Sequence, residues 1–207
     1  MSRLTSSRLG MIRFDGADVQ PFLQGYLTAD TTKLNEQWQL TALCDIKGRV
    51  IASGWASLQQ EGVWWVLHTD MVAPVLEFLA PYLRFSRTRA EQVEAPVVFE
   101  LQPALRFDAA DGPVEDGDEA LLSHLFEHRI VLVDSTTTGG FLPQMIGLVD
   151  AGAVSFDKGC YLGQEVVARA QHRGEVKRRL AVAEGANDDP VALKAPQGTL
   201  VVTRTTG

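Results

Sequence analysis

The stretch WQLTALCDIKGRVIASGWASLQQEGVWWVLH, residues 38–68, decides the fold class of this chain. Its runs 38–44, 49–58 and 63–68 read as three consecutive strands. Asp-Ile-Lys-Gly separates the first two runs, and Gly48 suits the positive φ of a hairpin turn. Strands joined by short turns pair antiparallel, so the stretch predicts an antiparallel sheet.

Further elements are predicted on both sides of this sheet. Residues 8–14 alternate as a strand does, and apolar residues between 19 and 27 recur at helical spacing. The other predicted elements are a helix over 71–83, a hairpin and solvated loop over 86–117, a helix over 118–128, a loop over 136–140, a short strand over 154–156, a helix over 162–172, and strands over 180–183 and 199–203. Strands outnumber helices and come in hairpins, which favours an α+β fold over a doubly wound sheet.

The composition is that of an ordinary globular protein. Of 207 residues, 45% are apolar and 22% are charged, which allows one large domain or two small ones. No run of 18 apolar residues is present, and residues 1–14 lack the apolar segment of a secretory signal. We therefore expect a cytoplasmic protein without a membrane span. A reducing compartment would keep its two cysteines, Cys44 and Cys160, as thiols.

Charge is unevenly distributed along the chain. The formal net charge of −7 argues against general adhesion to nucleic acid. Residues 108–119 are acidic, whereas residues 169–179 carry five basic residues and a histidine. The negative total therefore conceals a local positive patch.

Residues 158–165, Lys-Gly-Cys-Tyr-Leu-Gly-Gln-Glu, gather the side chains best suited to chemistry. Gly159 and Gly163 permit close approach of a ligand. If a helix begins near residue 162, Lys158 and Cys160 lie beside its unpaired N–H groups. The positive end of a helix favours a thiolate and can hold a carboxylate or phosphate.

The residues that follow extend this candidate site. Gln164 offers a donor and an acceptor, and Glu165 suits the first turn of a helix and can pair with Arg169. Arg169 and Arg173 share one helical face, since they are four positions apart. We expect these arginines to border one pocket with Lys158.

Plainer interpretations of the same residues stay open. Cys160 can be a small buried residue, Glu165–Arg169 a surface pair, and the run 169–179 a solvated face. Structural roles are expected for the histidines, which have no ligand-like spacing: His68, His124, His128 and His172. No dinucleotide, phosphate-loop, zinc-protease or hydrolase motif is present. The residues by themselves predict an anion- or cofactor-binding site near Cys160, and no metal site.

The segment SFDKGCYLGQEVVAR at 155–169, followed by HRGEVKRRL at 172–180, resembles the signature of the YgfZ-type folate-binding proteins. Shorter matches agree in order: Gly16-Ala17-Asp18, Phe22-Leu23-Gln24-Gly25 with Thr28, Cys44-Asp45-Ile46-Lys47-Gly48-Arg49, and Phe141-Leu142-Pro143-Gln144-Met145. The resemblance runs from about residue 9 to residue 180.

This resemblance implies an aminomethyltransferase folate-binding-like fold, in which subdomains surround a channel for tetrahydrofolate. It implies a discontinuous folate-binding subdomain, 1–45 plus 120–180, and an inserted ferredoxin-like subdomain, 46–119. Residues 181–207 would be the remnant of a C-terminal β subdomain. Because the sequence stops at residue 207, we expect the β-barrel of that family to be truncated or absent here.

The resemblance also implies a function. It points to an accessory protein that binds tetrahydrofolate or a folate derivative and supports iron–sulfur enzymes or assembly proteins, including enzymes that modify tRNA. Cys160 is the candidate catalytic residue, with redox chemistry, sulfur chemistry and transient contact with a cluster all left open. The candidate cofactor-binding residues are Lys158, Gly159, Tyr161, Gly163, Gln164, Glu165, Arg169 and Arg173. Among these, Lys158, Arg169 and Arg173 suit the carboxylates of a folate tail.

Two other functions are weighed against this one. A glycine-cleavage type aminomethyltransferase carries Asp-x-Ser-His near its N-terminus, where this chain has Leu4-Thr5-Ser6-Ser7, and lacks the KGCYxGQE segment. The resemblance leaves open whether the chain turns over a substrate; an enzyme of this kind would be a folate-dependent one-carbon transferase. Direct tRNA binding through 169–179 is not expected, because the whole chain is acidic.

Overall fold

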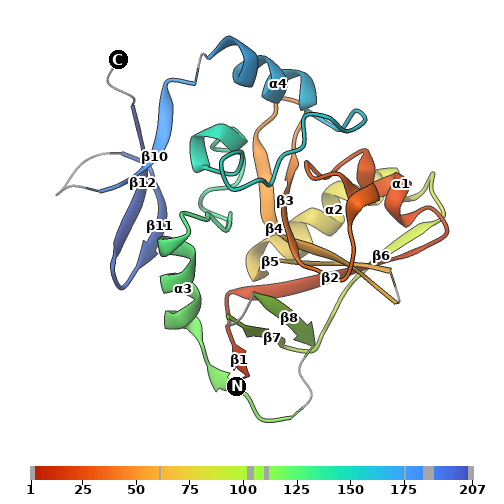
Figure 1. Cartoon of the computed structure of the whole chain (residues 1–207). Helices are drawn as coiled ribbons and strands as arrows, with labels where there is room; N and C mark the ends of the chain where they lie inside the picture. The colour runs from red at the N-terminus through yellow and green to blue at the C-terminus, as the bar shows by residue number, and fades with distance from the viewer. Residues whose placement is uncertain are drawn as a thin grey trace.

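The computed structural model describes residues 3–60, 62–101, 105–109, 112–174, 176–183 and 189–204 (Figure 1). The α-helices in these ranges are α1 (Val19–Gln24), α2 (Val72–Leu83), α3 (Asp118–Glu127) and α4 (Gln164–Arg173). Short 3-10 turns lie at Thr31–Lys33, Thr69–Met71 and Pro143–Ile146. The strands are β1 (Leu4–Thr5), β2 (Leu9–Gly16), β3 (Gln39–Cys44), β4 (Val50–Gln59), β5 (Gly62–His68), β6 (Thr88–Gln92), β7 (Val97–Glu100), β8 (Arg106–Ala109), β9 (Glu115–Asp116), β10 (Arg178–Val182), β11 (Val191–Ala195) and β12 (Gly198–Arg204).

A five-stranded sheet in the order β3-β4-β5-β2-β6 forms the centre of the molecule. Each neighbouring pair is antiparallel, as the stretch 38–68 predicts. The turn between β3 and β4 closes through a hydrogen bond from the Gly48 N–H to the Asp45 carbonyl, and Gly48 has a φ of 71°. The predicted subdomain boundary at 45/46 falls in this turn, inside one sheet, and the division into subdomains stays a prediction.

Both faces of this sheet are covered. On one face, Phe14, Trp65 and Leu67 pack with α1 and α2, and all three are fully buried. On the other face, Met11 and Val66 pack with residues of α3, the segment 130–148 and the C-terminal strands. Alternating side chains of single strands thus serve two cores. Removing so much apolar surface from water is the main stabilising contribution to this arrangement.

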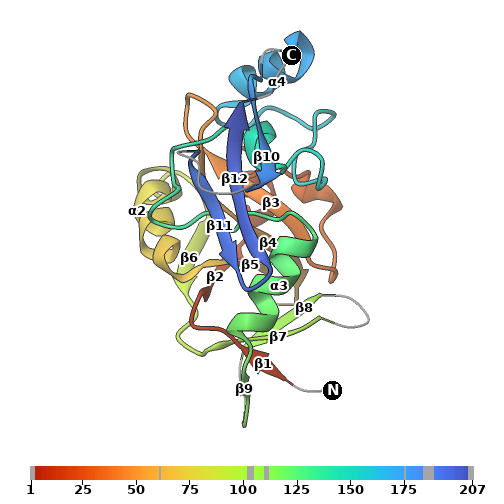
Figure 2. The same ribbon diagram turned by 90° about the vertical axis from the view of Figure 1, so that its left-hand side faces the viewer.

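Two smaller sheets complete the fold. β8, β7, β1 and β9 form one, in that order, and β10, β12 and β11 form the other. Figure 2 shows the second sheet facing the viewer, with α3 beside its lower end. Helix α3 contacts both β11 and β12. Among the described residues the C-terminal strands form this open three-stranded sheet and no closed barrel.

The structure corrects several predicted elements. Residues 154–156 form no strand; the Ser155 N–H donates instead to the Thr28 carbonyl, across the chain. Helix α4 begins at Gln164, two residues later than expected, because Gly163 has the left-handed conformation that precedes it. Helix α2 ends at Leu83 as predicted, with Pro81 inside it. Strand β11, Val191–Ala195, was not predicted.

In the part of the chain that the structure describes, no helix has the length and apolar character needed to cross a membrane.

Candidate functional site

Lys158 and Tyr161 are the buried residues of the segment 158–165. Only 8% of the surface of Lys158 is exposed, and its Nζ donates to the carbonyls of Leu27 (2.5 Å) and Ala29 (2.8 Å). The ammonium also lies 5.1 Å from the centre of the Tyr161 ring. Burial lowers its pKa to about 8, against the opposite effect of the Asp30 carboxylate. The hydrogen bonds of Lys158 therefore join its segment to the loop after α1.

The two glycines of the segment have different roles. Gly163 precedes α4 with a φ of 80°, and a Cβ there would lie 2.2 Å from the Asp45 carbonyl oxygen. Gly163 thus allows α4 to begin directly against the β3–β4 turn. A Cβ on Gly159 would meet nothing within 4 Å, and its φ is an ordinary one. Gly159 is exposed, and packing in the folded chain gives no steric reason for a glycine at this position.

Tyr161 and Gln164 close the segment on itself. The Tyr161 N–H donates to Gln164 Oε1 (3.1 Å), and the Leu162 N–H donates to the Gly25 carbonyl (3.0 Å). The Tyr161 ring is buried, and burial raises the pKa of its hydroxyl. Within the described residues this hydroxyl has no hydrogen-bond partner. The Gln164 side chain thus supports the local backbone, and the Tyr161 ring packs beneath it.

The remaining predicted residues point away from this buried part. Cys160, Glu165, Arg169 and Arg173 are exposed. Among the described residues no ion pair joins Glu165 to Arg169. None of the three cavities found in the described structure is lined by Lys158 together with either arginine. Ligand binding by these residues stays a prediction, whereas the geometry gives Lys158, Gly163 and Gln164 structural roles.

The two thiols differ strongly. Cys44 is fully buried, and burial raises its pKa to about 12. Cys160 is exposed at the surface. In the described part of the chain no group of three or more His, Cys, Asp or Glu side chains is placed to hold a metal ion. Any chemistry of Cys160 with a cluster would therefore need ligands from elsewhere.

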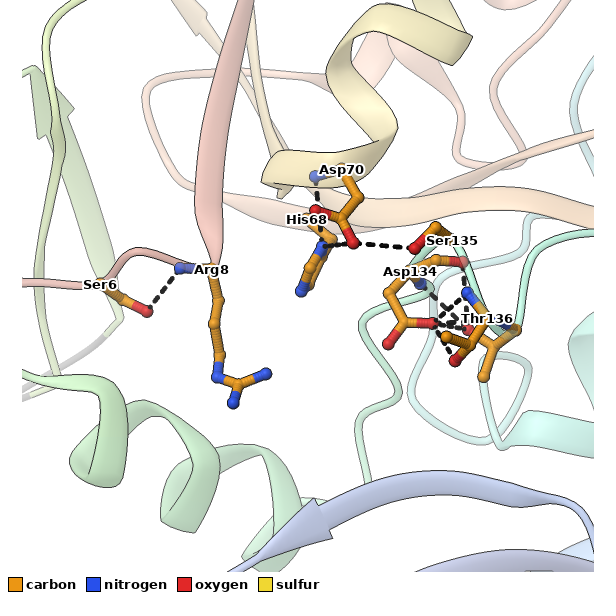
Figure 3. Close-up of polar contacts among 8 residues, drawn as sticks. Ser6, Arg8, His68, Asp70, Asp134, Ser135 and Thr136 are labelled. Atoms are coloured by element: carbon orange, nitrogen blue, oxygen red, sulfur yellow. Dashed lines mark hydrogen bonds and ion pairs between the residues drawn. The ribbon is translucent and has the colours of Figure 1, made fainter.

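A cleft of about 380 Å³ lies away from this segment, where the central sheet, α3, the segment 132–137 and β11 meet (Figure 3). Its apolar wall consists of Leu122, Leu125, Leu132, Val191, Ala192 and Leu193. Its polar lining consists of Arg8, His68, Asp134, Thr136, Thr137 and Lys194. An apolar wall with a few converging polar groups is typical of small-molecule sites.

His68 ends β5 and presents an unpaired nitrogen to this cleft. Its Nδ1 accepts the Asp70 N–H (3.3 Å), which places the proton of the neutral ring on Nε2. The residue is 8% exposed, and Nε2 has no hydrogen-bond partner in the described structure. Burial lowers the pKa of His68, although Asp70 and Asp134 act in the opposite direction. A neutral imidazole with a free N–H therefore faces the cleft (Figure 3).

Asp134 presents a free carboxylate oxygen to the same space. Its Oδ1 accepts from the backbone N–H and the hydroxyl of Thr136 (2.9 and 2.8 Å) and from the same groups of Thr137 (3.0 and 2.8 Å). Partial burial opposes ionisation of Asp134, but these bonds outweigh it and lower the pKa below its ordinary value. In Figure 3 the other oxygen points toward the space below His68. The lining of the cleft thus includes one donor, His68 Nε2, and one acceptor, the free oxygen of Asp134.

Two cations lie at the edge of the cleft. The Arg8 Nε is 3.9 Å from Asp118 Oδ2, and its guanidinium points into the space between β2 and α3 (Figure 3). Lys194 is exposed on β11. Both could pair with an anionic group of a ligand that extends out of the cleft. None of these cleft residues stood out in the sequence; the available signal was a histidine at the end of a buried strand, two positions before an Asp.

Comparisons with known proteins give a consistent result. No family model matches the chain. It is 27% identical over 239 aligned residues to "tRNA-modifying protein YgfZ" of Escherichia coli O127:H6, and 28% identical to the protein of the same name of Shigella boydii serotype 18. Each alignment covers 89% of this chain and 72% of the relative.

The fold has a counterpart among solved structures. The glycine cleavage system aminomethyltransferase T from Bartonella henselae superposes with a TM-score of 0.66, covering 97% of this chain and 77% of that one. The two sequences are 12% identical, so the likeness concerns the fold. It confirms the predicted aminomethyltransferase-like α+β fold with antiparallel sheets.

Proposed function

We propose that this chain, a homologue of the YgfZ proteins with an aminomethyltransferase-like fold, binds tetrahydrofolate or a folate derivative and assists iron–sulfur enzymes, including enzymes that modify tRNA. The observation that carries folate binding is the cleft of about 380 Å³. It combines an apolar wall for a flat ring with the unpaired Nε2 of His68. A buried N–H without a partner is costly, and a ligand acceptor would satisfy it.

The homology and the placement of the cysteines support the proposed accessory role. Cys44 is buried, and Cys160 is the exposed thiol of the segment that matches the YgfZ signature. Two thiols so differently placed do not form a four-thiolate cluster site. The proposal is therefore that the chain acts on clusters held by partner proteins, with Cys160 as its reactive group.

Calorimetric titration of the full chain with tetrahydrofolate tests the first part. Saturable binding at one site per chain is expected. Absence of binding would overturn the folate proposal. Lys158→Ala is a poor probe here, because it leaves the carbonyls of Leu27 and Ala29 without their donor. Paired variants are better: Arg8→Ala removes a cation of the cleft, whereas Arg169→Ala with Arg173→Ala removes the arginines predicted for the folate tail.

Expression in Escherichia coli cells that lack YgfZ tests the second part. The chain is expected to restore the tRNA nucleosides made by iron–sulfur enzymes, measured by mass spectrometry of digested tRNA. Cys160→Ala at equal protein level is expected to restore less. No restoration by the unaltered chain would refute the accessory role in those cells.

An aminomethyltransferase activity is the alternative, favoured only by the fold. The chain has Leu4-Thr5-Ser6-Ser7 in place of the Asp-x-Ser-His of those enzymes. Incubation with an aminomethylated lipoyl carrier and tetrahydrofolate is expected to yield no methylene-folate. Sustained product formation would replace the accessory role with this enzymatic one.

A further inference from the structure

We propose that His68 and Asp134 form a recognition pair that selects one heterocycle edge: a carbonyl oxygen next to a ring N–H. This inference rests on the proposed folate binding and names the residues and the ligand edge that would account for it. The pterin ring of a folate carries such an edge, with its 4-oxo group beside the N3–H and the 2-amino group.

The first argument is the polarity of the two side chains. Nδ1 of His68 accepts the Asp70 N–H, so the neutral ring can only donate at Nε2. Asp134 is ionised, so its free oxygen can only accept. A ligand edge that fits both must accept toward His68 and donate toward Asp134. A 4-oxo pterin does so.

The second argument is that both side chains are held before a ligand arrives. The imidazole is 8% exposed and fixed through Nδ1, and the Asp134 carboxylate is fixed through Oδ1 by the two threonines. The groups left over are Nε2 and Oδ2, and both face the cleft (Figure 3). Because little side-chain freedom remains to be lost, ordering these two side chains adds little to the entropic cost of binding.

The third argument concerns what surrounds the pair. The side chains of Leu122, Leu125 and Leu132 form an apolar surface on which a flat ring can pack. Arg8 and Lys194 line the same cleft and suit the carboxylates of a folate tail. The cleft thus matches a folate at three points: ring face, ring edge and anionic tail.

Folic acid and aminopterin provide the probes, because aminopterin has an amino group in place of the 4-oxo group and a ring N3 that carries no hydrogen. A 4-amino group presents a donor to the His68 N–H, which leaves a buried donor unpaired. Calorimetry on the full chain is expected to show folic acid binding at least tenfold more tightly than aminopterin. In His68→Asn, which retains an acceptor for the Asp70 N–H but has no group at Nε2, this preference is expected to fall by about threefold or more, and the part caused by N3 at Asp134 is expected to remain.

Two further variants make the test specific. His68→Gln keeps an N–H donor near the Nε2 position and is expected to restore the preference. Asp134→Asn keeps an oxygen for the two threonines while the cleft-facing atom becomes a donor, so folic acid binding is expected to weaken about tenfold to a hundredfold. Thermal melts within a few degrees of the parent identify variants that remain folded.

A spectroscopic readout accompanies the affinities. With ¹⁵N-labelled histidine, folic acid is expected to shift the Nε2 resonance of His68 in the parent protein, whereas His124 and His128 stay unmoved. If folates bind but the preference and the His68 resonance do not change, the recognition pair is wrong and folate binding stands. If neither tetrahydrofolate nor folic acid binds the parent protein, the proposed function itself is wrong.

Discussion

At the scale of single residues, the segment 158–165 has a structural role in addition to its predicted functional one. Lys158 secures the loop that contains Leu27 and Ala29, and Gly163 lets α4 meet the β3–β4 turn. The density of polar groups that makes the segment conspicuous thus has two origins. Part of it holds backbone, and the exposed remainder, Cys160 above all, is available to other molecules.

Gly163→Ala tests the close packing of α4 against the β3–β4 turn. The new Cβ would overlap the Asp45 carbonyl oxygen at 2.2 Å, in a backbone conformation that alanine disfavours. Chemical denaturation is expected to show a loss of about 2–4 kcal/mol in the free energy of unfolding. Gly159→Ala is the control, since its Cβ meets open space, and a change of about 0.5 kcal/mol or less is expected. Equal effects of the two substitutions would contradict these different roles.

The contrast between these glycines also shows how far the sequence reaches. Both are visible as breaks in the segment, and both were predicted to serve a ligand. The difference lies in residues 45–48, more than 110 positions away, which no local pattern connects to 163. The antiparallel hairpin of 38–59 was predictable because its alternation and its turn glycine are local. The different roles of the two glycines depend on packing between residues far apart in the sequence.

At the scale of elements, one buried hydroxyl attaches the cleft segment to the central sheet. Ser53 on β4 donates to the Val131 carbonyl (2.7 Å) and accepts the Val133 N–H (2.9 Å). These bonds fix the segment that continues into Asp134. An irregular segment thereby gains the backbone partners that a strand would receive from its neighbour.

Ser53→Ala is therefore expected to be costly. It leaves one buried carbonyl and one buried N–H without partners, at about 1–3 kcal/mol each, so a total loss of about 2–6 kcal/mol is expected in urea unfolding. Ser135→Ala removes an exposed hydroxyl that donates to Asp70 Oδ2 and serves as the control, at about 0.5 kcal/mol or less. A loss below about 1 kcal/mol for Ser53→Ala would show that the segment is held by other contacts.

The sequence could not reveal this attachment or the pair that depends on it. His68 had no partner at metal-ligand spacing, so a structural role was the reasonable expectation. Asp134 lies in a run that reads as a loop. Only the crossing of β5 with the segment 131–137, more than 60 positions apart, places the free atoms of the two side chains in one space.

At the scale of the whole molecule, Lys158 links stability to pH. Its pKa is about 8 in the folded chain against 10.5 for the ordinary side chain, so the unfolded chain binds more protons between these values. The penalty for burying the ammonium is complete below pH 8 and is relieved as the pH rises toward 10.5. The contribution of Lys158 to stability should rise by at most about 3 kcal/mol across this window.

Comparison with Lys158→Met isolates that contribution. The thiol of Cys44 and the hydroxyl of Tyr161, whose pKa values are raised by burial, weaken the folded state at high pH in both proteins. The difference in unfolding free energy between parent and variant, measured from pH 7.5 to 10, is therefore expected to move in favour of the parent. A constant difference would show that Lys158 is hydrated in the folded chain.

The lining of the cleft has a kinetic consequence. Arg8, His68, Asp134 and Lys194 come from four separate parts of the chain, so the cleft is complete only after its most distant contacts have formed. We expect the cleft to be unformed in the folding transition state, in which case ligand binding acts on the unfolding rate alone. A bound folate would then lower the rate of unfolding and leave the rate of refolding unchanged. In a stopped-flow chevron, only the unfolding arm should move, and the lifetime of the folded chain would lengthen with ligand concentration.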